Sequence, residues 1–174
     1  ISPKVVTIPV GSLEELKKPD KARRRHALIT ASRLAGEKHI DWIIDAVVAA
    51  REKVPDISID IYGKGGEEEK LRAQIAKLDC GDYVRLCGQQ NLQEVYQNYE
   101  AYLSGSTSEG FGLTLMEAVG AGLPIIGFDV RYGNPNFIDD AENGYLIPVH
   151  DKMEKQERVE KLAACIVRLV TEAD

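Results

Sequence analysis

Residues 101–128 have the sequence AYLSGSTSEGFGLTLMEAVGAGLPIIGF. The apolar runs at 101–103 and 124–128 have the length of buried strands, and the stretch between them, at 113–121, predicts a helix. A strand, a helix and a second strand in this order form a βαβ unit, whose two strands are parallel. Ligands of parallel sheets bind beyond the carboxyl ends of the strands, so the chemistry is expected first in the loop at 104–112.

The same alternation extends through the chain from residue 26. Further strands are predicted at 27–31, 57–62, 84–87 and 145–147, and further helices from residue 40 up to Pro55, around Leu71 to Leu78, at 92–99 and at 154–170. The helix at 113–121 is expected to turn Leu115, Ala118, Val119 and Gly122 toward the sheet, and the last helix to bury Val159, Leu162, Ala163, Ile166 and Leu169. The predicted fold class is therefore α/β, a doubly wound parallel sheet with helices on both faces.

Composition limits the partners. The chain has 174 residues, of which 44% are hydrophobic and 29% charged, which excludes disorder over most of its length. Lys and Arg total 22 against 28 Asp and Glu, a formal net charge of −6, which argues against broad binding to nucleic acid or to anionic lipid. No apolar run is long enough to span a bilayer. Any phosphate recognition must come from a local site.

The cysteines and the start of the chain add two expectations. Cys80, Cys87 and Cys165 form no C-x-x-C pair and no metal-ligand spacing, so we expect free thiols in a reducing, cytoplasmic compartment. The chain starts at Ile1, which we interpret as the start of a fragment. Residues 1–25 are expected to hold a connector and a first short strand, and residues 26–174 the domain. The basic cluster Lys21, Arg23, Arg24 and Arg25 is interpreted as a solvated loop.

The loop that leads into the helix at 113–121 has the pattern of an anion site. Gly110 and Gly112 let the backbone approach a ligand closely. The amides of Leu113 and Thr114 fall in the first helical turn, where N–H groups have no helical partner and the helix dipole favours negative charge.

Two carboxylates flank this loop. Glu117, one turn into the helix, is placed to accept two hydrogen bonds from sugar hydroxyls, and Glu109 lies where the group beyond the phosphate is expected. The alternative is that Glu109 only caps or solvates the loop and Glu117 is a surface residue. The glycines and the helix start favour a binding cleft, because both predict one at the same place.

The first strand-to-helix loop carries two cations. Arg33 and Lys38 are placed to clamp a diphosphate, Arg33 through its forked guanidinium and Lys38 as a point charge. The alternative, equally favoured by the spacing, is ordinary surface charge paired with Glu37.

Weaker signals lie nearby. His39 is a candidate base, although a helix-start residue near solvent is the commoner case, and Gly63-x-Gly65 is only half of a dinucleotide fingerprint. No Asp-x-Asp motif, P-loop or zinc motif is present, so neither a metal nor another cofactor is expected.

These motifs together resemble a known family. Glu109-x7-Glu117, with Gly-Phe-Gly-Leu-Thr between and Ala-Gly-Leu-Pro after, is similar to the signature of retaining GT-B glycosyltransferases of family 4, and the loop from Ser32 to Lys38 is similar to that family's pyrophosphate loop. The resemblance covers nearly the whole chain. It implies the C-terminal, Rossmann-like half that binds the nucleotide-sugar donor, with the acceptor-binding half preceding Ile1. His39 stands where many members have Gly, and Asn136 where many have Glu.

The resemblance also implies roles for individual residues. Its catalytic positions are Arg33, Lys38 and Glu109, and its substrate-binding positions are Gly88, Gln89, Gly110, Phe111, Gly112, Leu113, Thr114 and Glu117. The two cations would neutralise the leaving diphosphate, Glu117 would hold the ribose, and Gly88 and Gln89 would lie near the uracil. Retention without an evident nucleophile implies front-face substitution, in which the departing phosphate helps to deprotonate the acceptor hydroxyl.

A narrower resemblance comes from residues 62–66, 107–114 and 127–135. It is to the transferases of accessory secretion systems, which attach N-acetylglucosamine from UDP-GlcNAc to Ser or Thr of serine-rich repeat adhesins. It implies a non-catalytic glycosyltransferase B partner, bound through the missing half, and peripheral membrane association through that half only. A fragment is expected to bind donor without glycosylating protein. Two alternatives stay open: a non-catalytic GT-B-like partner subunit, and a family 4 transferase with another UDP-sugar.

Overall fold

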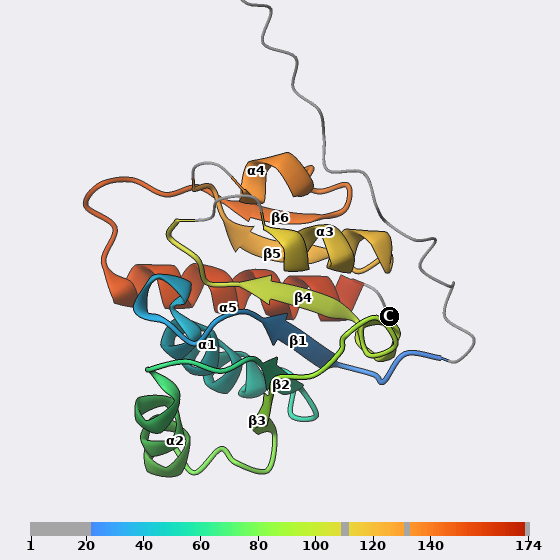
Figure 1. The fold of residues 1–174 in the computed structure, drawn as a ribbon. Coiled ribbons are helices and arrows are strands. Elements are labelled where there is room, and N and C mark those ends of the chain that lie inside the picture. The colour runs from blue at the N-terminus through green and yellow to red at the C-terminus, as the bar shows by residue number, and fades with distance from the viewer. Residues whose placement is uncertain (1–21, 109–111, 131–132, 173–174) are drawn as a thin grey trace, which may run out of the picture.

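The computed structural model describes residues 22–108, 112–130 and 133–172. They form one sheet of six parallel strands in the order β3-β2-β1-β4-β5-β6 (Figure 1). The strands are β1 Ala27–Ala31, β2 Ser58–Tyr62, β3 Val84–Gly88, β4 Ala101–Ser104, β5 Ile125–Phe128 and β6 Gly144–Ile147. The chain starts in the middle, moves out to β3 and returns to place β4 against β1. The order therefore reverses between β1 and β4, where doubly wound sheets open a ligand crevice.

Helices cover both faces, as predicted. They are α1 Ile40–Arg51, α2 Glu68–Lys77, α3 Leu113–Gly120, α4 Asn134–Phe137 and α5 Lys155–Glu172, with 3-10 turns η1 at Gly36–Lys38 and η2 at Tyr96–Asn98. Figure 1 shows α1 and α5 side by side along the sheet and α3 beside β5. Successive strand residues face opposite ways, so Leu28 belongs to the core under α1 and α5, and Ile29 to the core that contains η2 and α3.

Three helical predictions need correction. The helix expected at 92–99 is only η2, closed by a hydrogen bond from the Tyr99 amide to the Tyr96 carbonyl (3.1 Å), because so short a segment cannot sustain an α-helix alone. In α5 the buried stripe ends on Val170 and Leu169 is half-buried, because Val170 lies one full turn beyond Ile166. Val119, expected to face the sheet, is exposed, and so is Gly122.

The basic cluster is not a solvated loop in its described part. Arg24 donates to the buried carboxylate of Asp60 in β2 at 2.6 Å, and Arg23 donates to the Gly122 carbonyl beyond the end of α3 at 2.8 Å. The connector is therefore fixed to the domain from residue 23 onward. Lys21 and the strand expected within residues 5–10 lie outside the described residues, so the division at residue 25 stays a prediction.

Two further expectations concern the whole described chain. Cys80 is buried, Cys87 and Cys165 are half-buried, and all three are free thiols, as expected. Among the helices that the structure describes, none combines the length and the apolar composition needed to cross a bilayer.

Candidate functional site

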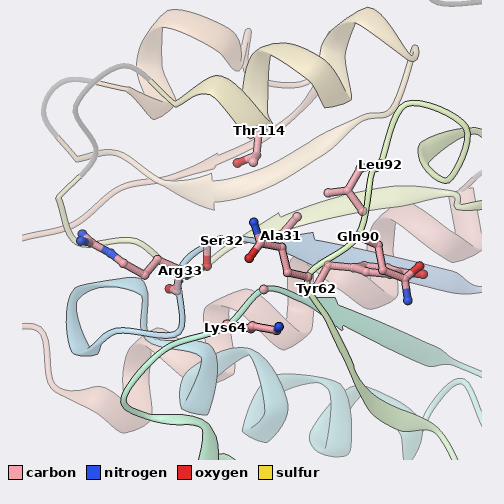
Figure 2. A pocket seen from close by; sticks show the side chains of 10 residues that line it. Ala31, Ser32, Arg33, Tyr62, Lys64, Gln90, Leu92 and Thr114 are labelled. Atoms are coloured by element: carbon pink, nitrogen blue, oxygen red, sulfur yellow. Dashed lines mark hydrogen bonds between the residues drawn. The ribbon is translucent and has the colours of Figure 1, made fainter.

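A pocket of about 360 Å³ opens at the carboxyl ends of β1 and β2 (Figure 2). It is lined by Ala31, Ser32, Arg33, Tyr62, Gly63, Lys64, Gln89, Gln90, Leu92 and Thr114. Ala31 and Tyr62 are the last residues of their strands, and Gln89 follows β3. The pocket therefore lies at the sheet edge where the strand pattern predicted it.

The structure brings some predicted site residues together here and leaves others outside. Arg33, Gln89 and Thr114 line the pocket. Gly88 ends β3 beside Gln89, and its carbonyl accepts a hydrogen bond from the Gly63 amide at 2.8 Å. The described residues that were predicted but do not line the pocket are Lys38, Gly88, Gly112, Leu113 and Glu117. Glu109, Gly110 and Phe111 lie outside the described residues.

Lys64 and the pair Gln90 and Leu92 are pocket residues that the sequence analysis missed. Figure 2 shows Lys64 on the side of the pocket opposite Thr114. The feature of the sequence that could have indicated Lys64 is the weak Gly63-x-Gly65 motif, in which Lys64 is the middle residue. A Cβ at Gly63 would overlap the Ser32 carbonyl oxygen, so glycine there lets the β2–α2 loop pack against the β1–α1 loop and delivers Lys64 to the site.

Arg33 pairs with Glu37, as the surface-charge alternative predicted, and it also lines the pocket. Its side chain is 73% exposed, and its Nη2 lies 2.9 Å from Glu37 Oε1. Figure 2 shows the guanidinium at the outer end of the pocket, away from Tyr62 and Gln90. A hydrogen bond to its own main chain and the adjacent Arg33 lower the pKa of the Glu37 carboxyl against the opposing effect of desolvation. Arg33 is therefore a pocket cation that a carboxylate already holds, and an anionic ligand has to compete with Glu37 for it.

The start of α3 has the geometry of an anion site. Gly112 has φ 71°, which glycine adopts without strain, and the first helical hydrogen bond runs from the Met116 amide to the Gly112 carbonyl at 3.0 Å. The amides of Leu113 and Thr114 precede that bond, so no helical carbonyl accepts from them. Thr114 places this helix tip on the pocket wall.

The carboxylate of Glu117 accepts a hydrogen bond from a buried tyrosine. The Tyr96 hydroxyl donates to Glu117 Oε2 at 3.0 Å, and the Tyr96 ring is almost completely buried. Burial raises the pKa of Tyr96 strongly, and the nearby Tyr102 and Glu117 add to the shift, so the phenol keeps its proton and remains a donor. One oxygen of Glu117 is thus fixed, and the carboxylate keeps capacity for further donors.

Lys38 lies in the loop that packs against the β4–α3 loop. The Thr107 amide donates to the Glu37 carbonyl at 3.1 Å, and His39 Nε2 lies 3.1 Å from Thr107 Oγ1. A Cβ at Gly105 would come within 2.8 Å of the Lys38 carbonyl oxygen, so this close approach depends on glycine. The loop that carries Lys38 is therefore joined to the β4–α3 loop at Gly105 and Thr107.

Metal-binding residues do not cluster here. Across the described residues, no three His, Cys, Asp or Glu side chains are grouped so that they could hold a metal ion. The positive groups that line the described pocket are Arg33 and Lys64.

The parallel sheet, its reversal between β1 and β4 and the helix tip at the crevice define a Rossmann-like domain of the GT-B glycosyltransferase type. The chain belongs to the family described as glycosyl transferases group 1, whose model matches residues 12–165.

Relatives and solved structures agree with this family. The UDP-N-acetylglucosamine–peptide N-acetylglucosaminyltransferase GtfA subunit of Limosilactobacillus reuteri subsp. suis is 56% identical over 99% of this chain and 34% of its own length. The pneumococcal O-GlcNAc transferase GtfA, solved in complex with UDP and GlcNAc, has a TM-score of 0.94 and 52% identity over 98% of this chain and 34% of its own. A GtfA/B complex matches with a TM-score of 0.85 and 53% identity over 95% of this chain and 32% of its own. The chain thus spans about a third of the length of these relatives.

Proposed function

We propose that this chain is the donor-binding half of a retaining transferase that moves N-acetylglucosamine from UDP-GlcNAc to Ser or Thr of a serine-rich repeat protein. The observation that carries the proposal is the pocket at the carboxyl ends of β1 and β2, which joins Arg33, Gln89 and the α3 tip at Thr114. Such a crevice with a helix N-terminus on its wall suits a nucleoside diphosphate. Identity above 50% with GtfA subunits supports the choice of donor sugar.

Each group has a part in the proposed binding. The amides of Leu113 and Thr114 donate to the distal phosphate, and Glu117, braced by Tyr96, accepts from the ribose hydroxyls. Gly88 and Gln89 lie beside the uracil. Arg33 and Lys38 neutralise the diphosphate without a metal or another cofactor, and the pocket position of Lys64 adds a third positive charge. Glu109 and the backbone at Gly110 and Phe111 hold the donor sugar.

The proposed reaction is substitution on the front face of the sugar. The bond from the anomeric carbon to the β-phosphate oxygen breaks, UDP leaves with the electron pair, and the acceptor hydroxyl bonds to the same face of the carbon while its proton passes to the departing phosphate. Arg33 and Lys38 stabilise the charge that develops on that phosphate. The rest of the catalysis is positioning, which requires the acceptor-binding half.

Partners and location belong to the same proposal. A related chain is solved as a GtfA/B complex, which supports a non-catalytic glycosyltransferase B partner for the longer protein. We place the protein in the cytoplasm, in keeping with its free thiols. Any membrane association is peripheral and made by parts outside this chain.

Calorimetric titration of this chain tests the proposal. UDP and UDP-GlcNAc are expected to bind at one site, and GDP-mannose to bind at least about tenfold more weakly, because the base and sugar both differ. UDP-glucose that binds as tightly as UDP-GlcNAc would favour a transferase with another UDP-sugar. Absence of binding by every uridine nucleotide would contradict a donor-binding role and favour a non-catalytic subunit.

A further inference from the structure

The side chain of Tyr102 crosses the crevice beneath the pocket. Tyr102 lies in β4 and is 2% exposed. Its hydroxyl donates to the Ala31 carbonyl at 2.7 Å, lies 3.4 Å from the Ala31 amide and is 2.9 Å from Thr114 Oγ1. One hydroxyl therefore contacts the end of β1 and the first turn of α3, which are far apart in sequence and both line the pocket.

The Tyr102 hydroxyl links β1 to β4 beyond the point where their backbone pairing ends. The ladder between β1 and β4 contains Leu28 with Ala101 and Ile29 with Tyr102, and goes no further. Ala31, two residues beyond, is still in register with β2, but on the β4 side its amide and carbonyl contact the Tyr102 hydroxyl. The side chain thus closes the sheet where the backbones diverge, and the loop that carries Ser32 and Arg33 leaves β1 directly after this point.

Counting hydrogens assigns the direction of the bond to Thr114. A tyrosine hydroxyl has one hydrogen and two acceptor positions. The Ala31 carbonyl can only accept, so it takes that hydrogen, and Thr114 must then donate its own hydroxyl hydrogen to Tyr102. The donor that Thr114 keeps for an anion is its main-chain N–H, which points out of the helix start.

We infer that Tyr102 is a positioning residue for nucleotide binding: its hydroxyl fixes the distance between the Arg33 loop and the tip of α3, so that the cation and the amides meet one diphosphate. The inference rests on the proposed function and adds a residue that touches no ligand. Tyr102 acts on the ligand through Ala31 and Thr114, whereas a purely structural tyrosine would support the fold without setting this distance.

A double-mutant cycle with UDP titrations on this chain tests the role. Tyr102→Phe keeps the ring and removes the hydroxyl, and Thr114→Val keeps the shape and removes the partner. Each single change is expected to weaken UDP binding about 5- to 10-fold, the effect of one lost hydrogen bond at the site. The double variant is expected to bind no worse than Tyr102→Phe, because both changes break the same bond. Thr114→Ser, which restores the hydroxyl, should bind UDP as the unchanged chain does.

Controls separate positioning from folding and from the proposed function. Tyr145→Phe also removes a tyrosine hydrogen bond, to Glu172, remote from the pocket, and should leave UDP affinity unchanged. If Tyr102→Phe does not fold, weak binding by Thr114→Val together with normal binding by Thr114→Ser supports the bridge, and equal binding by both overturns it. The role of Tyr102 is overturned if folded Tyr102→Phe binds UDP as the unchanged chain does, or if the losses of affinity from the two single changes multiply in the double variant. Either result leaves the proposed function standing. Failure of the unchanged chain to bind UDP overturns the proposed function and this role with it.

Discussion

His39 lies flat against Trp42, with ring centroids 3.5 Å apart and 12° between the planes. The stacking accompanies a left-handed backbone at His39, with φ 43°. The resemblance to family 4 implies glycine at this place in many members, and the backbone angle offers a physical reason, because glycine adopts it without strain. Histidine is retained here with two compensating contacts, the stacked indole and Thr107.

The His39 ring should make stability depend on pH. Burial lowers the pKa of His39 below its ordinary value of 6.5; among its neighbours Asp41 and Glu37 oppose this shift, and Arg158 and Lys155 add to it. The unfolded chain therefore binds the proton on His39 more tightly than the folded chain does. The contribution of His39 to stability is fully present above pH 6.5, and it is lost as the pH falls from 6.5 toward the lower pKa of the folded state. Urea unfolding at about pH 7.5 and about pH 5 measures this loss.

Two variants isolate the contribution of His39. His39→Asn tolerates the left-handed backbone and cannot titrate, and His39→Gly removes both the ring and the strain. Both should show a smaller loss of stability between the two pH values than the unchanged chain. An undiminished loss in both variants would show that other groups produce it.

Removal of the buried Asp60 carboxylate should strongly destabilise the fold. Its side chain is 7% exposed and accepts from Arg24, Arg85 and Tyr99, each at 2.6 Å. Burial alone would raise the pKa of Asp60, but the hydrogen bonds from Arg85, Tyr99 and Arg24 outweigh it and lower the pKa. We expect Asp60→Asn to cost about 3 kcal/mol in free energy of unfolding by urea at neutral pH.

Arg24→Met is the matched comparison for Asp60→Asn. It removes one of the three donors to Asp60 and leaves Arg85 and Tyr99 in place, so it should cost less than half as much. Equal costs for the two variants would contradict the central place of the carboxylate.

The contribution of Asp60 to stability should also depend on pH. Because the pKa of Asp60 is lowered in the folded chain, this contribution is present above the ordinary carboxyl range and is lost as the pH falls through the pKa of the folded state.

Removal of Arg33 should weaken UDP binding, whereas neutralisation of Glu37 should not. Arg33→Ala removes the guanidinium proposed to clamp the diphosphate and should weaken UDP binding about 10-fold or more. Glu37→Gln frees Arg33 from its carboxylate partner and should leave binding equal or up to about threefold tighter. Lys70→Ala is the control for net charge, because Lys70 is a surface cation of α2 whose partner is Glu67. Unchanged affinity in Arg33→Ala, measured by calorimetry, would eliminate the clamp.

Glu117 should distinguish ribose from deoxyribose. If its carboxylate accepts from the ribose hydroxyls, the unchanged chain binds UDP at least about fivefold more tightly than 2′-deoxy-UDP. Glu117→Ala should bring the two affinities close together, and Tyr96→Phe, which releases one oxygen of Glu117, should reduce the preference by a smaller factor. A preference that persists in Glu117→Ala would place ribose recognition elsewhere.

The sequence predicted the order of strands and helices because apolar runs and turn residues alternate clearly. The run at 27–31 became β1, and the loop at 104–112 was identified as the entrance to α3 because glycines precede a regular helical stretch. Contacts between distant segments were not predictable in this way. Tyr96 and Tyr102 look like core aromatics in sequence, and only the fold brings their hydroxyls to Glu117 and Thr114. Likewise, nothing local in the basic cluster indicates that Arg24 pairs with Asp60.

The anchored connector has a consequence for how larger parts of the protein can move. Arg23 holds the Gly122 carbonyl, just beyond the α3 end opposite the pocket, and Arg24 holds a central strand. Arg23 and Arg24 are therefore part of this domain in the same way as its strands, and any movement of the pocket carries these two residues with it.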